Sequence, residues 1–255
     1  FHAAVVAEIA AADSPVLFFR GNTFPCKLTM ELLRALSHNY LDSLSSKVRT
    51  LATSFSDEDA LALELMPPSF NPELLNGLTP EQAAQEALPK FFNFCQATLD
   101  FILAEPIPDT LKFLLQHAKQ QALVKWPEAA HTVVSVLLML RLVIPSVVML
   151  EDLPASVRRV VIRTGQVIQC IANEHGMKNM PDLTAWAKDR EPEMRAFLSA
   201  ASTTPLSIND ISATMKPEEE LTLEDMNAIM SFVKNRPPVL AQLKQVSLSS
   251  ASSSS

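Results

Sequence analysis

The chain has 255 residues, of which 48% are hydrophobic and 19% charged, so it can bury one large core or two joined lobes. Its net charge of -7 argues against the concentrated basic surface that nucleic-acid binding requires. There are 4 glycines and 18 prolines, and the stretches between the prolines are rich in helix-forming residues. The composition therefore predicts an all-α protein with prolines at helix boundaries and no nucleic-acid partner.

The first helices are separated by clear turn and capping signals. Apolar residues recur at helical spacing over 1–12 and again over about 24–52. Arg20-Gly21-Asn22 lies in the loop between them, with Thr23 as the expected N-cap of the second helix. Prolines and Gly77 interrupt 53–80, which we expect to be a connection with short helical turns.

Capping signals and apolar periodicity also predict the later helices. Thr79-Pro80-Glu81-Gln82 has the form of a capping box, and the helix that it opens runs to about residue 104 with a potential break at Pro89. The segment "VRRVVIR" has the composition of a strand, but its apolar period continues too far, so a helix is predicted. The remaining predicted helices are 109–125, 127–144 ending near Pro145, 155–174, 181–201, 207–214 and 222–235. We assign 1–235 to one helical domain and 236–255 to an extension with a disordered serine-rich tail.

The segment 132–150, "TVVSVLLMLRLVIPSVVML", approaches the length of a membrane span. Its central Arg141 would cost about 2.5–3.5 kcal/mol on insertion, and Pro145 would interrupt the helix. A buried helix at the centre of a soluble bundle fits better. We therefore predict no membrane span.

The cysteines Cys26, Cys95 and Cys170 lie far apart and have no metal-ligand spacing, so neither a disulfide framework nor a zinc site is predicted. This pattern is typical of a reduced, cytoplasmic protein. The chain opens on Phe1 without a signal-peptide pattern, and we expect a piece of a longer protein whose flanking domains could recruit it to membranes. Catalytic nucleophile motifs, paired metal-binding histidines and glycine-rich phosphate loops are absent from the sequence, so no cofactor of its own is expected.

Two arginines occupy unusual positions. Arg20 follows the apolar run "VLFF" and precedes Gly21-Asn22, so an anchored loop would project its side chain, although an ordinary solvated loop residue is the simpler interpretation. Arg141 lies within an apolar helix, where its five donors need acceptors. It forms either a structural salt bridge or cap in the core, or it binds the carbonyls of the loop that bears Arg20.

At these sites the sequence resembles the Ras GTPase-activating domain of neurofibromin and its relatives. Three motifs are similar and occur in order: "LFFRGNTFPCK" to L-F-R-G-N-S-L-A-S/T-K, "MLRLVIPSVV" to F-L-R-F/L-x-x-P-A-I, and "QCIAN" to Q-N/S-L/I-A-N. With the segments between them, the resemblance covers roughly residues 1–205.

The resemblance implies an irregular all-α bundle of this family, with central catalytic helices and flanking extra helices. It implies that Arg20 is an arginine finger inserted into the nucleotide site of a GTP-bound Ras-family GTPase, and that Arg141 holds the finger loop through main-chain carbonyls. GTP and Mg²⁺ would belong to the partner, and the domain would have no independent enzymatic activity. The GTPase-binding groove would be lined by Asn22, Lys27, Leu140, Gln169 and Asn173, for which helix packing or surface polarity is the alternative interpretation.

Some positions depart from the family pattern. Gln166 replaces a lysine three residues before the matched glutamine, and Phe24-Pro25 replace leucine and alanine beside the finger. Two other functions therefore stay open. One is an IQGAP-type module, which binds GTP-loaded GTPases without speeding hydrolysis, and the other is a purely helical scaffold without a nucleotide-dependent partner.

Overall fold

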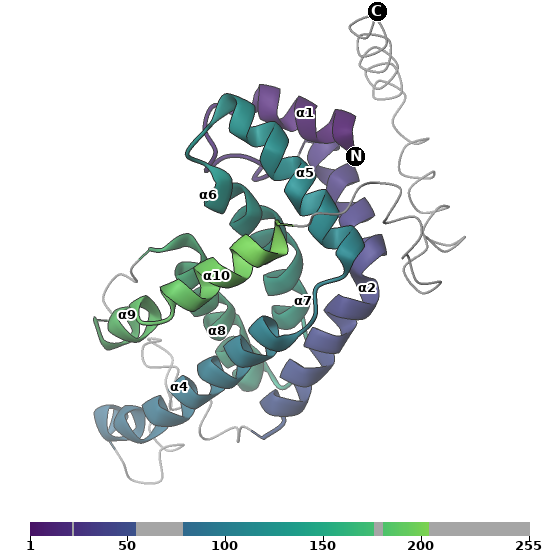
Figure 1. Cartoon of the computed structure of the whole chain (residues 1–255). Coiled ribbons are helices and arrows are strands. Elements are labelled where there is room, and N and C mark those ends of the chain that lie inside the picture. Colours follow the sequence, from purple (N-terminus) through teal and green to yellow (C-terminus); the bar gives the residue numbers. More distant parts are fainter. Residues whose placement is uncertain (22, 55–78, 176–180, 204–255) are drawn as a thin grey trace, which may run out of the picture. The chain divides into compact units, whose positions relative to one another are not determined.

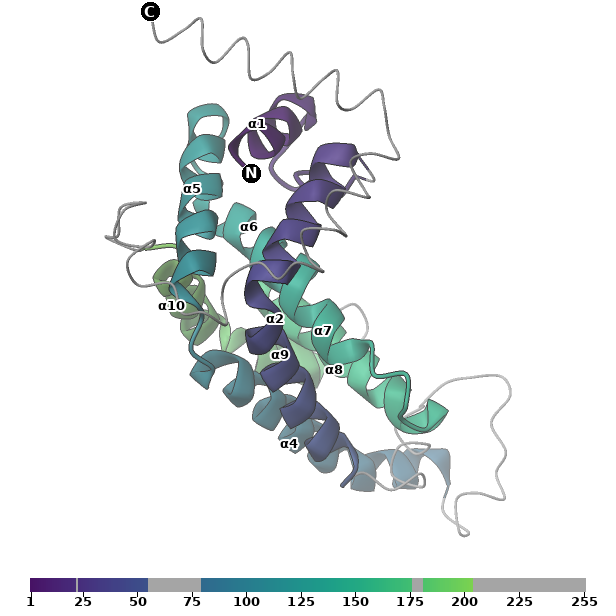
Figure 2. The ribbon, with the colours of Figure 1, turned by 90° about the vertical axis from the view of Figure 1, so that its right-hand side faces the viewer.

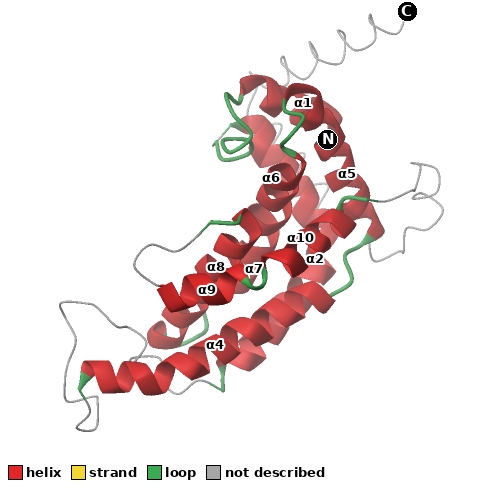
Figure 3. Cartoon of the chain, turned by 60° about the vertical axis from the view of Figure 1, so that its left-hand side comes forward, coloured by secondary structure: helices red, strands yellow, loops and turns green. Residues whose placement is uncertain are grey.

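A computed structural model describes residues 1–21, 23–54, 79–175 and 181–203 (Figure 1). Every regular element in these ranges is a helix, which confirms the all-α prediction (Figure 3). The predicted helices 207–214 and 222–235, the serine-rich tail and most of the connection 53–80 lie outside the described residues. The described elements are α1 His2–Ala11, α2 Phe24–Ala52, α4 Pro80–Ala104, α5 Asp109–Lys125, α6 Ala130–Val134, the π-helix η2 Ser135–Val143, α7 Ile144–Val148, α8 Ala155–Asn173, α9 Pro181–Lys188 and α10 Glu191–Ala201.

The start of α4 has the predicted capping box. Thr79 Oγ1 accepts a hydrogen bond from the main-chain N–H of Gln82 at 3.2 Å, and Gln82 Oε1 accepts one from the N–H of Thr79 at 2.9 Å. The helix then continues through Pro89 without a break. Proline in a helix interior removes one hydrogen bond and crowds the carbonyl four residues earlier, a cost that a helix held elsewhere by packing can tolerate.

The apolar helix extends further than its sequence predicts, because it does not end near Pro145 but continues to Val148. Between Ser135 and Val143 it has π geometry, and it returns to α geometry at Ile144. Pro145 therefore occupies the first turn of a new α-helical segment, where its missing N–H is not needed. Ala130–Val148 is long and apolar enough to cross a bilayer, but 56% of its most apolar window is buried inside the structure, as in a core helix.

The predicted helix 181–201 is two helices, α9 and α10, separated by a turn at Asp189 and Arg190. Pro192 is the second residue of α10. Its ring would clash with the carbonyl of Lys188 in a continuous helix, so the chain ends one helix at Lys188 and begins another.

The described chain forms two compact units. Unit 1 consists of 1–39, 107–142 and the residues from 198 on, and in it α5 packs against both α1 and α6 (Figures 1 and 2). Its core contains fully buried apolar side chains from 1–39 and 107–142, including Val5, Phe18, Leu33, Leu111, Leu115, Val133 and Leu137.

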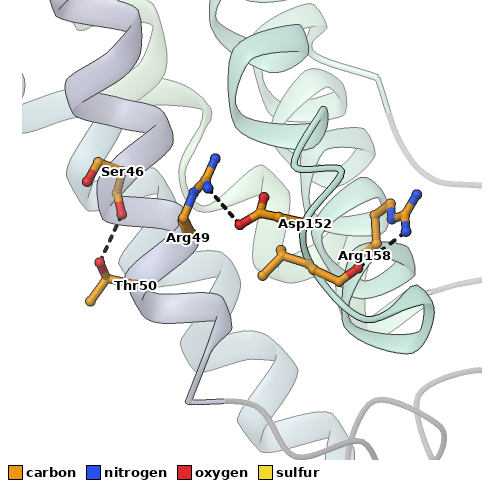
Figure 4. A network of polar contacts seen from close by, with 6 residues as sticks. Ser46, Arg49, Thr50, Asp152 and Arg158 are labelled. Carbon is orange, nitrogen blue, oxygen red and sulfur yellow. Dashed lines mark hydrogen bonds and ion pairs between the residues drawn. The ribbon is translucent and has the colours of Figure 1, made fainter.

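Unit 2 consists of 40–106 and 143–197, and in it α8 contacts α4, α7 and α9. Gly165 permits the approach of α8 to α7, since a Cβ there would lie 2.5 Å from Val148 Cγ1. Figure 4 shows Arg49 on α2 bound to Asp152 in the turn before α8, with 2.6 Å between Nη1 and Oδ2, and Arg158 donating to the carbonyl of Leu153. These contacts join the end of α2 to the start of α8 within unit 2.

Candidate catalytic loop and its anchors

Arg20 is exposed on the loop between α1 and α2, and its immediate predecessors are fully buried. Phe18 and Phe19 both have no accessible surface, whereas Arg20 and Gly21 face solvent. The N–H of Arg20 donates to the carbonyl of Leu17 at 3.1 Å, which closes a turn directly before the arginine. The sequence prediction of an anchored loop with an exposed arginine agrees with this arrangement, while Asn22 lies outside the described residues.

The backbone of this loop is held in an unfavourable conformation. Phe19 has φ of 52°, in the left-handed region that costs an L-residue about 1–2 kcal/mol. Aromatic packing offsets the cost. The ring centroids of Phe18 and Phe19 lie 4.4 Å apart in an edge-to-face arrangement, and those of Phe18 and Trp126 lie 6.0 Å apart. The Phe19 carbonyl also accepts a hydrogen bond from Cys26 Sγ at 3.4 Å. Packing therefore fixes the residue that precedes Arg20.

Lys125, the last residue of α5, anchors the entry to the loop. Its ammonium donates to the carbonyls of Ile9, Ala10 and Ala12 at 2.8, 3.3 and 2.7 Å, at the end of α1. The last carbonyls of a helix have no partner within the helix and attract cations. Lys125 thus caps the C-terminus of α1 and joins it to the end of α5, where Trp126 packs against Phe18 of the loop.

Thr23 and Glu8 anchor the other end of the loop, where the chain enters α2. Thr23 Oγ1 accepts a hydrogen bond from the N–H of Cys26 at 3.2 Å, which makes it the N-cap of α2 as predicted. The same hydroxyl donates to Oε1 of Glu8, a residue of α1 that is only 4% exposed. A buried carboxylate of α1 is therefore bonded to the first turn of α2.

Arg141 lies half-buried in the π-helical segment and interacts electrostatically with this same group of residues. Burial raises the pKa of Glu8, while the N–H of Cys26 and the positive charge of Arg141 lower it. Nε of Arg141 is buried, and no residue in the described part of the chain forms a hydrogen bond with it. The structure thus brings Arg141 close to Glu8 and Cys26, and its predicted bonds to the carbonyls of the Arg20 loop stay a prediction.

The thiol of Cys26 is kept neutral by its surroundings. Burial raises its pKa, Arg141 and Lys27 lower it, and Glu8 raises it further. A protonated thiol can donate a hydrogen bond, which is what its contact with the Phe19 carbonyl requires. Cys26 therefore acts as a small donor within the core that supports the loop.

The other predicted groove residues belong to different units. Lys27 and Leu140 are half-buried in unit 1, and Gln169 and Asn173 are half-buried near the end of α8 in unit 2. Both polar atoms of the Gln169 carboxamide are buried without a hydrogen-bond partner among the described residues, although burial of such a group costs about 1–3 kcal/mol when unpaired. An unsatisfied amide is available for a ligand or partner group.

Sequence reasoning missed Glu8, Lys125 and Trp126 as parts of this site. Glu8 is the one charged residue within the apolar run "AAVVAEIAAA", a signal of a buried and paired carboxylate. Lys125-Trp126 at a helix end carries no comparable signal, because its partners lie more than a hundred residues away. Within the described residues, no group of three or more His, Cys, Asp or Glu side chains could hold a metal ion.

No protein-family model matches the chain, and no curated protein matches it either.

Proposed function

We propose that this chain is a GTPase-activating domain of the Ras type, which accelerates GTP hydrolysis by a GTP-bound Ras-family GTPase through Arg20. GTP and Mg²⁺ are held by the partner, and the domain supplies a catalytic group without a substrate site of its own. In this proposal the helices form the irregular bundle of that family, and the domain acts in the cytoplasm.

One observation carries the proposal: an exposed arginine follows two fully buried phenylalanines on a loop anchored at both ends. An ordinary solvated arginine does not need a strained residue before it. Phe19 is held at φ 52°, and such strain persists only where the surrounding structure fixes it, often at functional sites.

The chemistry follows from the guanidinium group. Cleavage of the γ-phosphoryl bond of GTP spreads negative charge over oxygen atoms that the GTPase alone stabilises poorly. A planar group with a permanent charge and several N–H donors stabilises this charge in the transition state. Arginine fingers contribute about 10³–10⁵ in rate, and a loop fixed before encounter avoids the cost of ordering it during the reaction.

The remaining groove residues have proposed contact roles. Lys27, Leu140, Gln169 and Asn173 keep their proposed roles as contacts for the GTPase. The unpaired carboxamide of Gln169 supports a role in binding, since a partner group would satisfy it. Asn22 keeps its proposed role beside the finger.

Single-turnover GTP hydrolysis by a panel of Ras-, Rap- and R-Ras-type GTPases tests the proposal. The wild-type domain should accelerate hydrolysis by at least one of them, and Arg20→Ala should lose the acceleration while still binding the GTP-loaded protein. Arg34→Ala is a matched control, because Arg34 on α2 is an exposed arginine whose partner is Glu31, at 3.2 Å in the preceding turn. It should retain full activity, since exposed pairs of this kind contribute little.

Equal activity of Arg20→Ala and the wild type would exclude the finger. Binding of the GTP-loaded form without acceleration would indicate the IQGAP-type module, in which the exposed Gln166 lacks the charge of the family lysine. Absence of any nucleotide-dependent partner would leave a helical scaffold.

A further inference from the structure

Glu8 is a buried carboxylate that the proposed chemistry does not use. It lies on the second turn of α1, is 4% exposed, and accepts a hydrogen bond from the hydroxyl of Thr23. The main-chain N–H of Cys26 and the guanidinium of Arg141 also stabilise its charge. Each of these groups lies in unit 1.

Fold stability alone does not explain a carboxylate here. Burial of a carboxylate is costly, and a well-packed apolar side chain of similar volume is often equally stable or more stable. The pKa of Glu8 is raised mainly by burial, so its ionised form is disfavoured by the fold despite the nearby arginine. The gain from this residue must therefore lie in the geometry that it imposes.

The geometry that Glu8 imposes is the closure of the loop that bears Arg20. Glu8 lies before residue 12, where α1 has ended, and Thr23 is the N-cap of α2, so their hydrogen bond joins the two sides of the Arg20 loop. Lys125 fixes the entry side through the carbonyls of Ile9 and Ala12. With both ends held, fewer backbone conformations are open to the loop.

We propose that Glu8 is a positioning residue for Arg20, which holds the exit of the arginine loop through the hydroxyl of Thr23. The positive charge of Arg141 favours the ionised form of the same carboxylate and so opposes the effect of burial. The inference rests on the proposed function where it concerns hydrolysis, but the positioning of the loop can be measured without any GTPase.

Paired substitutions separate geometry from simple packing. Glu8→Met removes the acceptor and keeps the length of the side chain, whereas Glu8→Gln keeps an oxygen for the Thr23 hydroxyl. Thr23→Val removes the donor, and Thr23→Ser retains it. Glu31→Gln is the control, because Glu31 is an exposed carboxylate on α2 that pairs only with Arg34 in the described structure.

The first readout is amide hydrogen exchange of peptides that cover residues 13–21, without a GTPase. Exchange in Glu8→Met and Thr23→Val should be about tenfold faster than in the wild type, and exchange in Glu8→Gln and Thr23→Ser should stay within about threefold. The urea midpoint of Glu8→Met should not fall below that of the wild type, because removal of the costly buried carboxylate offsets the loss of its attraction to the half-buried Arg141. Unchanged exchange in both disruptive variants would overturn the proposal, as would a loss of global stability that accounts for the faster exchange.

The second readout is single-turnover hydrolysis at increasing domain concentration. Glu8→Met should lower the saturating rate about tenfold and leave the half-saturating concentration unchanged, with activity restored in Glu8→Gln. In an Arg20→Ala background the same substitution should have no further effect, because Glu8 acts through Arg20. An equal fall in both backgrounds would refute a role through the arginine. If the wild-type domain stimulates no GTPase, the proposed function fails, and hydrogen exchange alone then decides whether Glu8 positions the loop.

Discussion

The lysine at the end of α5 offers the sharpest test of how the arginine loop is built. Lys125 donates to three carbonyls, and the bonds to Ile9 and Ala12 are short, at 2.8 and 2.7 Å. Lys125→Met keeps the unbranched stem, which can still pack near Trp126, and removes the ammonium. The substitution therefore removes the hydrogen bonds together with the cation–π contact of the ammonium, which lies 4.9 Å from the centroid of the Trp126 ring, and keeps the packing of the stem.

The size of the effect follows from these contacts. Two charge-assisted hydrogen bonds contribute about 1.5–3 kcal/mol each before other terms. Ordering the lysine side chain costs about 2 kcal/mol, and exposure of the ammonium to water removes part of the remainder. We expect Lys125→Met to lower the free energy of unfolding of unit 1 by about 1–2 kcal/mol.

Urea unfolding followed by tryptophan fluorescence measures this change. The chain has 2 tryptophans, so a Trp186→Phe background leaves Trp126 as the reporter of unit 1. Lys112→Met is the control on the same helix, since Lys112 makes only an exposed pair with Asp109 at 2.9 Å and should change stability by less than about 0.5 kcal/mol. Equal unfolding midpoints for the two lysine variants would refute the cap at the end of α1.

Two further predictions concern packing and pH. Gly165→Ala should destabilise unit 2 by about 1–2 kcal/mol, because the new Cβ would lie 2.5 Å from Val148 Cγ1 and overpacking outweighs the gain in helix propensity. Addition of Val148→Ala should recover part of that loss in thermal unfolding, and a loss that is strictly additive would contradict the clash. For Glu8, a folded-state pKa above the unfolded value of about 4.5 means that its contribution to stability is present below that pH and is lost as pH rises through the folded pKa. Wild type should therefore lose stability relative to Glu8→Gln as pH rises above about 4.5 in urea titrations, and a constant difference between the two would show that the pKa of Glu8 is not raised.

Local signals predicted the helices well where the determinants lie within a few residues of each other. The capping box at Thr79 and the N-cap at Thr23 are contacts between near neighbours, and the structure contains both. Proline was harder to interpret, because its effect depends on the register around it. Pro145 follows a π-helical segment and begins a new α turn, whereas Pro192 ends one helix and begins another.

The residues of the candidate site also differ in whether their contacts lie near to them or far from them in the sequence. Arg20 could be predicted as exposed on an anchored loop, since the buried phenylalanines are its direct neighbours. Lys125 could not, because the carbonyls that it binds are 113 to 116 residues away and carry no side-chain signal. A carbonyl at a helix end exists in every helix, so only the packing of α5 against α1 determines which lysine reaches it.

Arg141, within the apolar helix, also interacts with a residue that lies far away in the sequence. Its sequence context predicts that the guanidinium of Arg141 needs hydrogen-bond partners, and this stays a prediction, because its Nε has none among the described residues. The context could not identify Glu8, which lies 133 positions earlier on α1 and is buried in the same unit. A carboxylate and a guanidinium placed so far apart in the chain can interact only once the helices of unit 1 have packed. Their interaction therefore makes the loop geometry depend on the completed fold, and the arginine loop should lose its protection from hydrogen exchange whenever unit 1 opens.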